Sequence, residues 1–131
     1  MSTATLAQTL DQAAIRFELT QAMKSCPDID SCILSTVDGH EVVSLSQRPT
    51  ATDRLSTMNS SILALAETMA RESQQELCRF VILENSNGRI VVLRVNRHLL
   101  LTCVSNLDSK LGMILTLGQR AAKSLAATIG G

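Results

Sequence analysis

The sequence predicts an α+β domain in which an antiparallel β-sheet is covered by helices on both faces. Residues 78–104 contain three consecutive apolar runs, separated by a Ser-Asn-Gly turn at 86–88 and an Asn-Arg-His turn at 96–98, which is the pattern of three antiparallel strands. Each run is apolar at successive positions, and successive strand residues point to opposite faces of a sheet. Both faces therefore need cover, and we expect helices above and below.

The first 46 residues predict a helix followed by a β-hairpin. Residues 5–25 contain no Gly or Pro and place apolar side chains at helical spacing, and Pro27 ends this helix. Two short apolar runs, 31–37 and 40–46, are joined by an Asp-Gly dipeptide that suits a tight hairpin turn. The predicted apolar face of the helix consists of Leu6, Leu10, Ala13, Ala14 and Phe17.

A second helix is predicted from Asp53 to about Gln74, with Thr52 or Asp53 as its N-cap. Its apolar residues recur at steps of three and four and form a stripe wider than one contact with a sheet needs. The extra width fits either plain core packing or a partner helix. Glu67 and Arg71 are expected to form an ion pair on the solvent side. The stripe is centred on Leu55, Met58, Ile62, Leu65 and Met69, and it is widened by Leu63, Ala66 and Ala70.

A last helix follows the three strands, with Asn106 or Asp108 as its predicted cap. Gly112 and Gly118 within it indicate close packing of the helix onto the sheet, and residues 130–131 form a frayed tail. No repeat or linker interrupts the chain, so residues 1–131 are expected to form a single domain. The apolar side of this helix consists of Leu111, Ile114, Leu115, Ala121, Ala122, Leu125 and Ile129.

The composition excludes several classes of function. Twelve basic and twelve acidic residues give a formal net charge of zero, so the chain lacks the basic footprint of a nucleic-acid-binding protein. No apolar run approaches the ~18 residues of a membrane span, and the first residues lack the pattern of a signal peptide. We therefore expect a cytoplasmic protein that binds no nucleic acid and does not insert into a membrane.

No arrangement of residues predicts an enzyme, a metal site or a cofactor. His40 and His98 lie at strand ends without a third ligand or an acid at recognisable spacing. The carboxylates are scattered singly along the chain. The cysteines show no CxxC or paired Cys/His spacing, and we expect them to be small buried apolar residues; they are Cys26, Cys32, Cys78 and Cys103.

The order and spacing of these elements resemble the Roadblock/LC7 family, in particular its bacterial MglB-like branch. The resemblance covers about residues 6–129 and depends on no single motif. It rests on a series of segments in this order: CPDIDSCILSTVDGHEVVS, DRLSTMNSSILALAETMA, FVILENSNGRIVVLRV, LLLTCV and LDSKLGMILTLG. The family implies a profilin-like fold, α-β-β-α-β-β-β-α, with a five-stranded antiparallel sheet in the order 2-1-5-4-3. It also implies the second helix on one face and the two terminal helices on the other.

The resemblance further implies a dimeric interaction module that binds and regulates a Ras-like small GTPase. Some bacterial members of the family stimulate GTP hydrolysis without contributing a catalytic arginine. The family dimerises through its third strand and second helix, which here implies an interface of Leu55, Met58, Ile62, Leu65, Met69, Cys78, Phe80, Val81 and Ile82. Polar residues of the same helix are then expected to contact the GTPase, namely Ser56, Asn59, Ser60, Glu67 and Arg71. The alternative is a profilin-like or PAS-like ligand-sensing domain, or a general scaffold.

Overall fold

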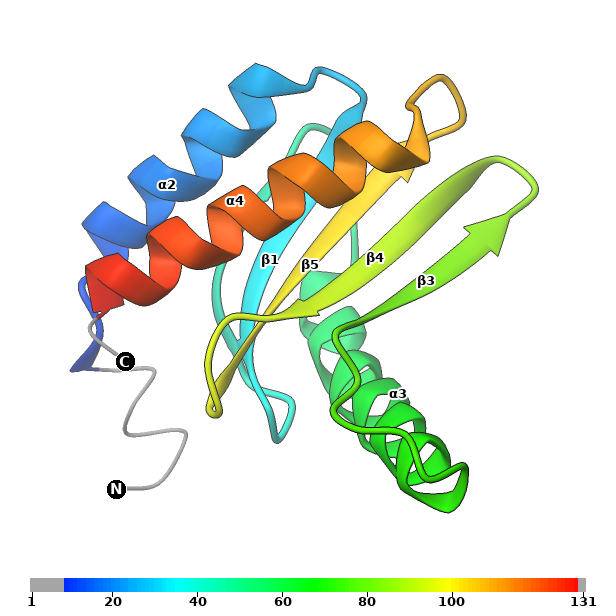
Figure 1. Ribbon diagram of the computed structural model, residues 1–131. Helices are drawn as coiled ribbons and strands as arrows, with labels where there is room; N and C mark the ends of the chain where they lie inside the picture. Colours follow the sequence, from blue (N-terminus) through cyan, green and yellow to red (C-terminus); the bar gives the residue numbers. More distant parts are fainter. Residues whose placement is uncertain (1–8, 130–131) are drawn as a thin grey trace.

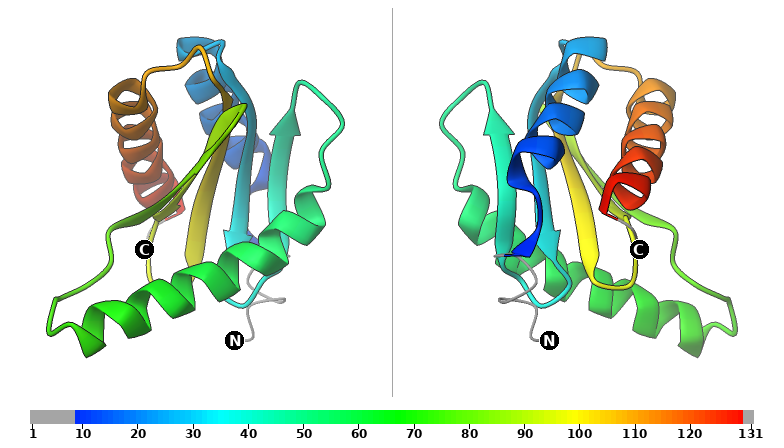
Figure 2. Two further views of the ribbon diagram at one scale, coloured as in Figure 1. Left: turned by 90° about the vertical axis from the view of Figure 1, so that its right-hand side faces the viewer. Right: turned by 90° about the vertical axis from the view of Figure 1, so that its left-hand side faces the viewer.

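The computed structural model describes residues 9–129. Five antiparallel strands form one sheet in the order β2-β1-β5-β4-β3, so β5 is central and β2 and β3 are the edges. Helices α2 and α4 lie side by side on one face, and α3 crosses the other (Figure 1, Figure 2). This confirms the predicted fold. The elements are α2 (Gln12–Ser25), β1 (Ile29–Thr36), β2 (Glu41–Ser46), α3 (Thr52–Glu72), β3 (Phe80–Asn85), β4 (Gly88–Arg94), β5 (Leu99–Asn106) and α4 (Leu111–Ile129).

Helix α2 begins after Asp11, whose carboxylate accepts a hydrogen bond at 3.1 Å from the backbone N–H three residues later. Its buried side chains are Ile15 and Leu19, whereas Phe17, which was predicted for the apolar face, is 60% exposed. Leu10 packs against the larger apolar cluster as predicted, but Phe17 does not, because the row that faces the sheet is formed by Ile15 and Leu19. The predicted residues 5–8, including Leu6, lie outside the described part of the chain.

Two glycines shape the hairpins. Gly39 ends the β1–β2 turn with a φ of +101°, a conformation that residues with a Cβ rarely adopt. The β3–β4 turn is a two-residue loop, since Asn85 pairs with Gly88. A Cβ on Gly88 would lie 2.4 Å from the carbonyl oxygen of Ser105 on β5. In both predicted turns, Asp-Gly and Ser-Asn-Gly, the backbone therefore requires glycine at its position.

The sheet separates two apolar clusters of unequal size. The larger cluster lies beneath α2 and α4 and includes Cys26, Cys32 and Cys103, which are 0–1% exposed. The smaller cluster centres on Leu63 of α3 and contacts the part-buried Cys78. Beside it, the interface between α3 and the sheet contains buried polar side chains. The two helical layers are therefore held by different chemistry, with the weaker apolar contribution under α3.

Helix α4 buries the side predicted for it, since Ile114, Ala121, Ala122 and Leu125 are buried. Gly118 packs closely as expected, because a Cβ there would lie 3.0 Å from a methyl group of Leu93. The same expectation was wrong for Gly112, which has nothing within 4 Å of its Cβ position. Asn106 and Asp108 do not cap the helix directly; the Asn106 side chain accepts from the Asp108 N–H in the preceding turn. The predicted tail at 130–131 lies outside the described residues.

None of the helices within residues 9–129 is long and apolar enough to cross a membrane.

Candidate functional site

The outer face of α3 carries a row of exposed apolar side chains. Met58, Leu65 and Met69 are 51%, 62% and 61% exposed, and Leu77, in the segment after the helix, is 69% exposed. These four are a majority of the seven large apolar side chains that are exposed among the described residues. Apolar exposure is thus concentrated on one helix and the segment that follows it, which is typical of a protein interaction site.

The open edge of β3 completes this surface. Within the described sheet, β3 pairs only with β4, so its outer backbone groups have no strand partner. Its apolar side chains are half-buried: Phe80 and Ile82 pack against the larger cluster, and Val81 packs against the smaller one. Helix α3 contacts β3 from below. An open, apolar edge strand next to an exposed apolar helix is a template for pairing with another chain.

The structure therefore places the predicted dimer residues in two groups. Three of them are more than half exposed on α3, and Leu55 and Ile62 are half-buried beside them. Cys78 lies two residues before the observed start of β3, not inside the strand as predicted. The half-buried members on or next to β3 are Cys78, Phe80, Val81 and Ile82.

Two of the residues predicted to bind the GTPase point into the protein instead. Ser56 is 0% exposed, and its hydroxyl donates to the carbonyl oxygen of Thr52 at 2.8 Å. Asn59 is 2% exposed, and its amide donates to the hydroxyl of Thr102 on β5 at 2.6 Å. Neither side chain is accessible to a partner, so these two assignments were wrong. Ser60 is half-buried, and its hydroxyl donates to the carbonyl of Thr57.

The predicted pair between Glu67 and Arg71 is also absent. Glu67 forms its ion pair with Arg94 on β4, and both side chains are mostly buried. Arg71 is exposed and donates to the hydroxyl of Thr68 one turn earlier. The Glu67–Arg94 ion pair connects α3 to the sheet. Because both side chains are mostly buried, removal of one of them would leave the other charge unpaired and destabilise the protein.

The sequence did not predict the orientation of α3, because two of the three buried residues of the helix are polar. Ser56, Asn59 and Leu63 recur at helical spacing, and they form the buried side of the helix. The N-terminus of α3 differs from the prediction as well. Ala51 occupies the cap position and has no polar side chain to cap the helix. The hydroxyl of Thr52, a predicted cap, accepts a hydrogen bond from Ser44 at 3.3 Å.

The titratable side chains show no catalytic arrangement within residues 9–129. No group of three His, Cys, Asp or Glu side chains in that range could hold a metal ion. His40 lies 4.0 Å from the carboxylate of Asp38, and both are more than half exposed. Cys32 and Cys103 face each other across β1 and β5; the hydrogen bond between their thiols and their burial raise the pKa of Cys32 well above its ordinary value. That shift keeps the thiol protonated and unreactive.

Comparisons with known proteins agree with this architecture. The chain is similar in structure to an MglB in a tetrameric arrangement (TM-score 0.84, 19% identity, covering 91% of this chain and 90% of the other). It is similar to the gliding protein MglB of Thermus thermophilus (TM-score 0.83, 17% identity, 91% and 90% covered). It also resembles Myxococcus xanthus MglB (TM-score 0.80, 15% identity, 86% and 92% covered).

At the level of sequence, no curated protein matches the chain. The profile of one domain family does, and it matches residues 17–105, from the middle of α2 to the end of β5. This range is well over half of the chain and contains all five strands and α3. The protein therefore belongs to the Roadblock/LC7 domain family.

Proposed function

We propose that this protein forms a homodimer through α3 and β3, and that the dimer binds and regulates a Ras-like small GTPase. The observation that carries the proposal is the row of Met58, Leu65, Met69 and Leu77 beside the open edge of β3. Family membership supports the same conclusion, since the resemblance implies dimerisation through these two elements. The tetrameric arrangement named for one MglB neighbour is a further example of self-association on this fold.

In the proposed dimer, the α3 helices of two copies lie antiparallel and the two β3 strands pair edge to edge. A helix of 21 residues is about 30 Å long at ~1.5 Å per residue, which suits a continuous seam. Burial removes the exposed apolar side chains from water. Pairing of the β3 edges satisfies backbone groups that otherwise depend on solvent.

A matched pair of double variants tests the dimer. Leu65→Glu/Met69→Glu places two carboxylates in the proposed seam, where burial of unpaired charge is costly. Phe17→Glu/Met113→Glu makes the same chemical change at positions of comparable exposure, 60% and 53%, on α2 and α4. Light scattering should show a dimer for the wild type and the α2/α4 variant, and a 14.1 kDa monomer for the α3 variant. A monomeric wild type at micromolar concentration would overturn the dimer and favour the ligand-sensing alternative.

The GTPase contact is proposed for the polar flank of the paired α3 helices. With Ser56 and Asn59 buried, Arg71 is the predicted contact residue whose side chain is exposed, and Ser60 and Glu67 lie at the edge of the surface. Mixed polar and apolar groups of this kind are usual in non-obligate interfaces. Because the apolar row is occupied by the second copy, the GTPase would meet the outer flanks of both helices.

Pull-downs with Ras-like GTPases from the source organism, loaded with a GTP analogue or with GDP, test this contact. Arg71→Glu should weaken binding while the dimer and its melting temperature stay unchanged. Arg16→Glu makes the same charge reversal on α2, on the opposite side of the sheet, and should have no effect. No binding of the wild type in either nucleotide state would contradict the GTPase assignment and leave a scaffold.

A further inference from the structure

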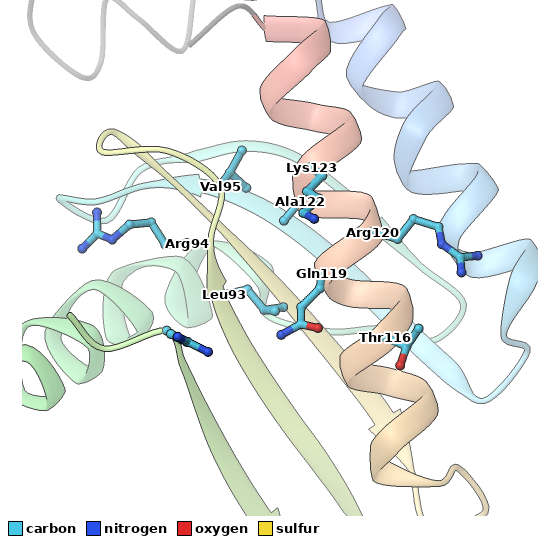
Figure 3. A pocket seen from close by; sticks show the side chains of 9 residues that line it. Leu93, Arg94, Val95, Thr116, Gln119, Arg120, Ala122 and Lys123 are labelled. Atoms are coloured by element: carbon cyan, nitrogen blue, oxygen red, sulfur yellow. The ribbon is translucent and has the colours of Figure 1, made fainter. Parts of the chain in front are cut away.

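A pocket of about 560 Å³ lies between α4 and the end of β4, on the face of the sheet away from α3. Its floor consists of Leu93, Val95 and Ala122, and its walls carry polar and charged side chains from α4. Gln119 projects from α4 toward Leu93 on β4 (Figure 3). The volume falls within the range of about 300–1,000 Å³ that is usual for small-molecule sites.

The charge of this pocket is entirely positive. Arg79, Arg120 and Lys123 line it together with Arg94, and no carboxylate does. Arg94 is already neutralised, since its side chain turns away from α4 (Figure 3) and pairs with Glu67. Arg79, Arg120 and Lys123 have no ion-pair partner among residues 9–129. The side chain of Arg120 extends toward α2, away from the pocket (Figure 3), so Arg79 and Lys123 are the cations available to a ligand. The formal net charge of the chain is zero, yet unpaired cations are concentrated here, and their positive potential favours the binding of an anion.

A second hollow adjoins the first and has the same sign. It measures about 450 Å³ and shares Arg79, Arg94 and Val95 with the first pocket. Arg97 adds another cation, and again no carboxylate lines the cavity. Arg79 therefore lies between two positively charged hollows, which raises the local potential beyond what one exposed arginine would produce.

The hydrogen-bonding groups of the first pocket limit the kinds of ligand that it can bind. The amide of Gln119 has no partner within the described chain and can donate into the pocket, whereas the hydroxyl of Thr116 is committed to the carbonyl oxygen of Gly112 at 2.8 Å. A guanidinium forms paired hydrogen bonds with phosphate, and a nearby ammonium adds a point charge. More than one unpaired cation per compact pocket favours a doubly charged group over a single carboxylate. The apolar floor suits the carbon skeleton next to such a group.

We propose that this pocket binds a small phosphate-bearing ligand, with Arg79 and Lys123 holding the phosphate and Gln119 donating a hydrogen bond to it. An acidic peptide fits less well, because it presents singly charged carboxylates spaced along a chain, whereas Arg79 and Lys123 line the same hollow and suit one doubly charged group. The phosphate can belong to a free metabolite or to a lipid headgroup. The first pocket lies on the face of the sheet opposite α3, whereas the adjoining hollow reaches Leu77 and Cys78 of the proposed dimer surface.

Two opposite substitutions at Gln119 give the sharpest test. The position is exposed on a helix, and both Glu and Lys are good helix formers, so neither variant should alter folding. Calorimetric titration with inorganic pyrophosphate should show binding to the wild type that is about tenfold weaker in Gln119→Glu and stronger in Gln119→Lys. A merely structural role for Gln119 predicts that both variants change in the same direction, and that result would overturn the proposal.

A charge-matched pair supplies the control. Arg79→Gln/Lys123→Gln removes two cations from the pocket, whereas Arg16→Gln/Lys24→Gln removes one Arg and one Lys from α2. The first variant should lose about tenfold or more in affinity, the second should match the wild type, and 0.5 M salt should weaken binding by screening. Equal losses in both variants would mean non-specific attraction and would refute the site.

Sedimentation with phosphatidylcholine vesicles, with and without phosphatidic acid, distinguishes the source of the phosphate. Binding of pyrophosphate alone assigns a soluble ligand, and binding of vesicles that contain phosphatidic acid assigns a headgroup. An absence of both, or binding of an acidic peptide in their place, would overturn the proposal.

Discussion

The buried hydrogen bond between Asn59 of α3 and Thr102 of β5 is expected to hold α3 in its orientation on the sheet. The two side chains are 2% and 0% exposed, and the amide nitrogen lies 2.6 Å from the hydroxyl oxygen. Thr102→Val keeps the shape of the side chain and leaves the amide without its partner, which costs about 1–3 kcal/mol in free energy of unfolding. Asn59→Ala leaves the hydroxyl without its partner at a similar cost and adds about 1 kcal/mol for the cavity.

The double variant Asn59→Ala/Thr102→Val removes both polar groups together. It leaves the cavity and the loss of one satisfied hydrogen bond, about 2 kcal/mol in all. The double variant should therefore be less destabilised than the sum of the single variants, by about 1–5 kcal/mol.

Urea unfolding followed by far-ultraviolet circular dichroism measures these differences at one fixed protein concentration, since a dimer couples stability to concentration. A change of 2 kcal/mol moves the midpoint by about 1 M if the urea dependence is about 2 kcal/mol per molar. Thr68→Ala removes a hydroxyl from the exposed side of the same helix and should stay within about 0.5 kcal/mol of the wild type. Additive effects of Asn59→Ala and Thr102→Val would refute the reasoning, because uncoupled side chains cannot be orienting the helix through this bond.

Two further predictions concern glycine and cysteine. Gly112→Ala should stabilise the protein by about 0.5 kcal/mol in thermal unfolding, because the Cβ meets nothing within 4 Å and alanine favours a helix; Gly88→Ala should lower the melting temperature, since its Cβ would lie 2.4 Å from the Ser105 carbonyl. The pKa of Cys32 is raised on folding by the Cys103 hydrogen bond and by burial. The stabilisation that results from this raised pKa should therefore be fully present below the ordinary thiol pKa of 9.0, and it should be lost as the pH rises through the raised pKa. Urea unfolding between pH 7 and 10 should show a smaller decline for Cys32→Ala than for the wild type, and equal declines would contradict it.

The sequence by itself determined the order of the elements and their hairpins, because these depend on local chemistry. The glycine at position 39 requires its positive φ wherever the hairpin lies in space, and the Asn85–Gly88 pairing follows from a two-residue turn. The apolar stripe of α4 could also be predicted from the sequence, since Ile114 and Leu125 are apolar residues that face an apolar cluster. The order of the strands in the sheet came from the family resemblance, because non-local pairing leaves no local signal.

Only the tertiary structure decided which side of α3 faces inward. Hydrophobicity alone ranks Met58 and Leu65 above Ser56 and Asn59, yet the polar pair is buried and the apolar pair is exposed. The reason is that burial depends on what the opposing surface offers, and here the sheet presents the hydroxyl of Thr102 at hydrogen-bonding distance.

The positively charged pocket between α4 and β4 could not be predicted from the sequence either. Arg79 and Lys123 are far apart in the sequence, and the pattern around each residue is that of an ordinary solvated charge. They line one cavity because β4 and α4 pack together and bring the segment before β3 close to the middle of α4. Charge balance over the whole chain conceals such a cluster, because a sum of charges contains no positions and a binding site depends on positions.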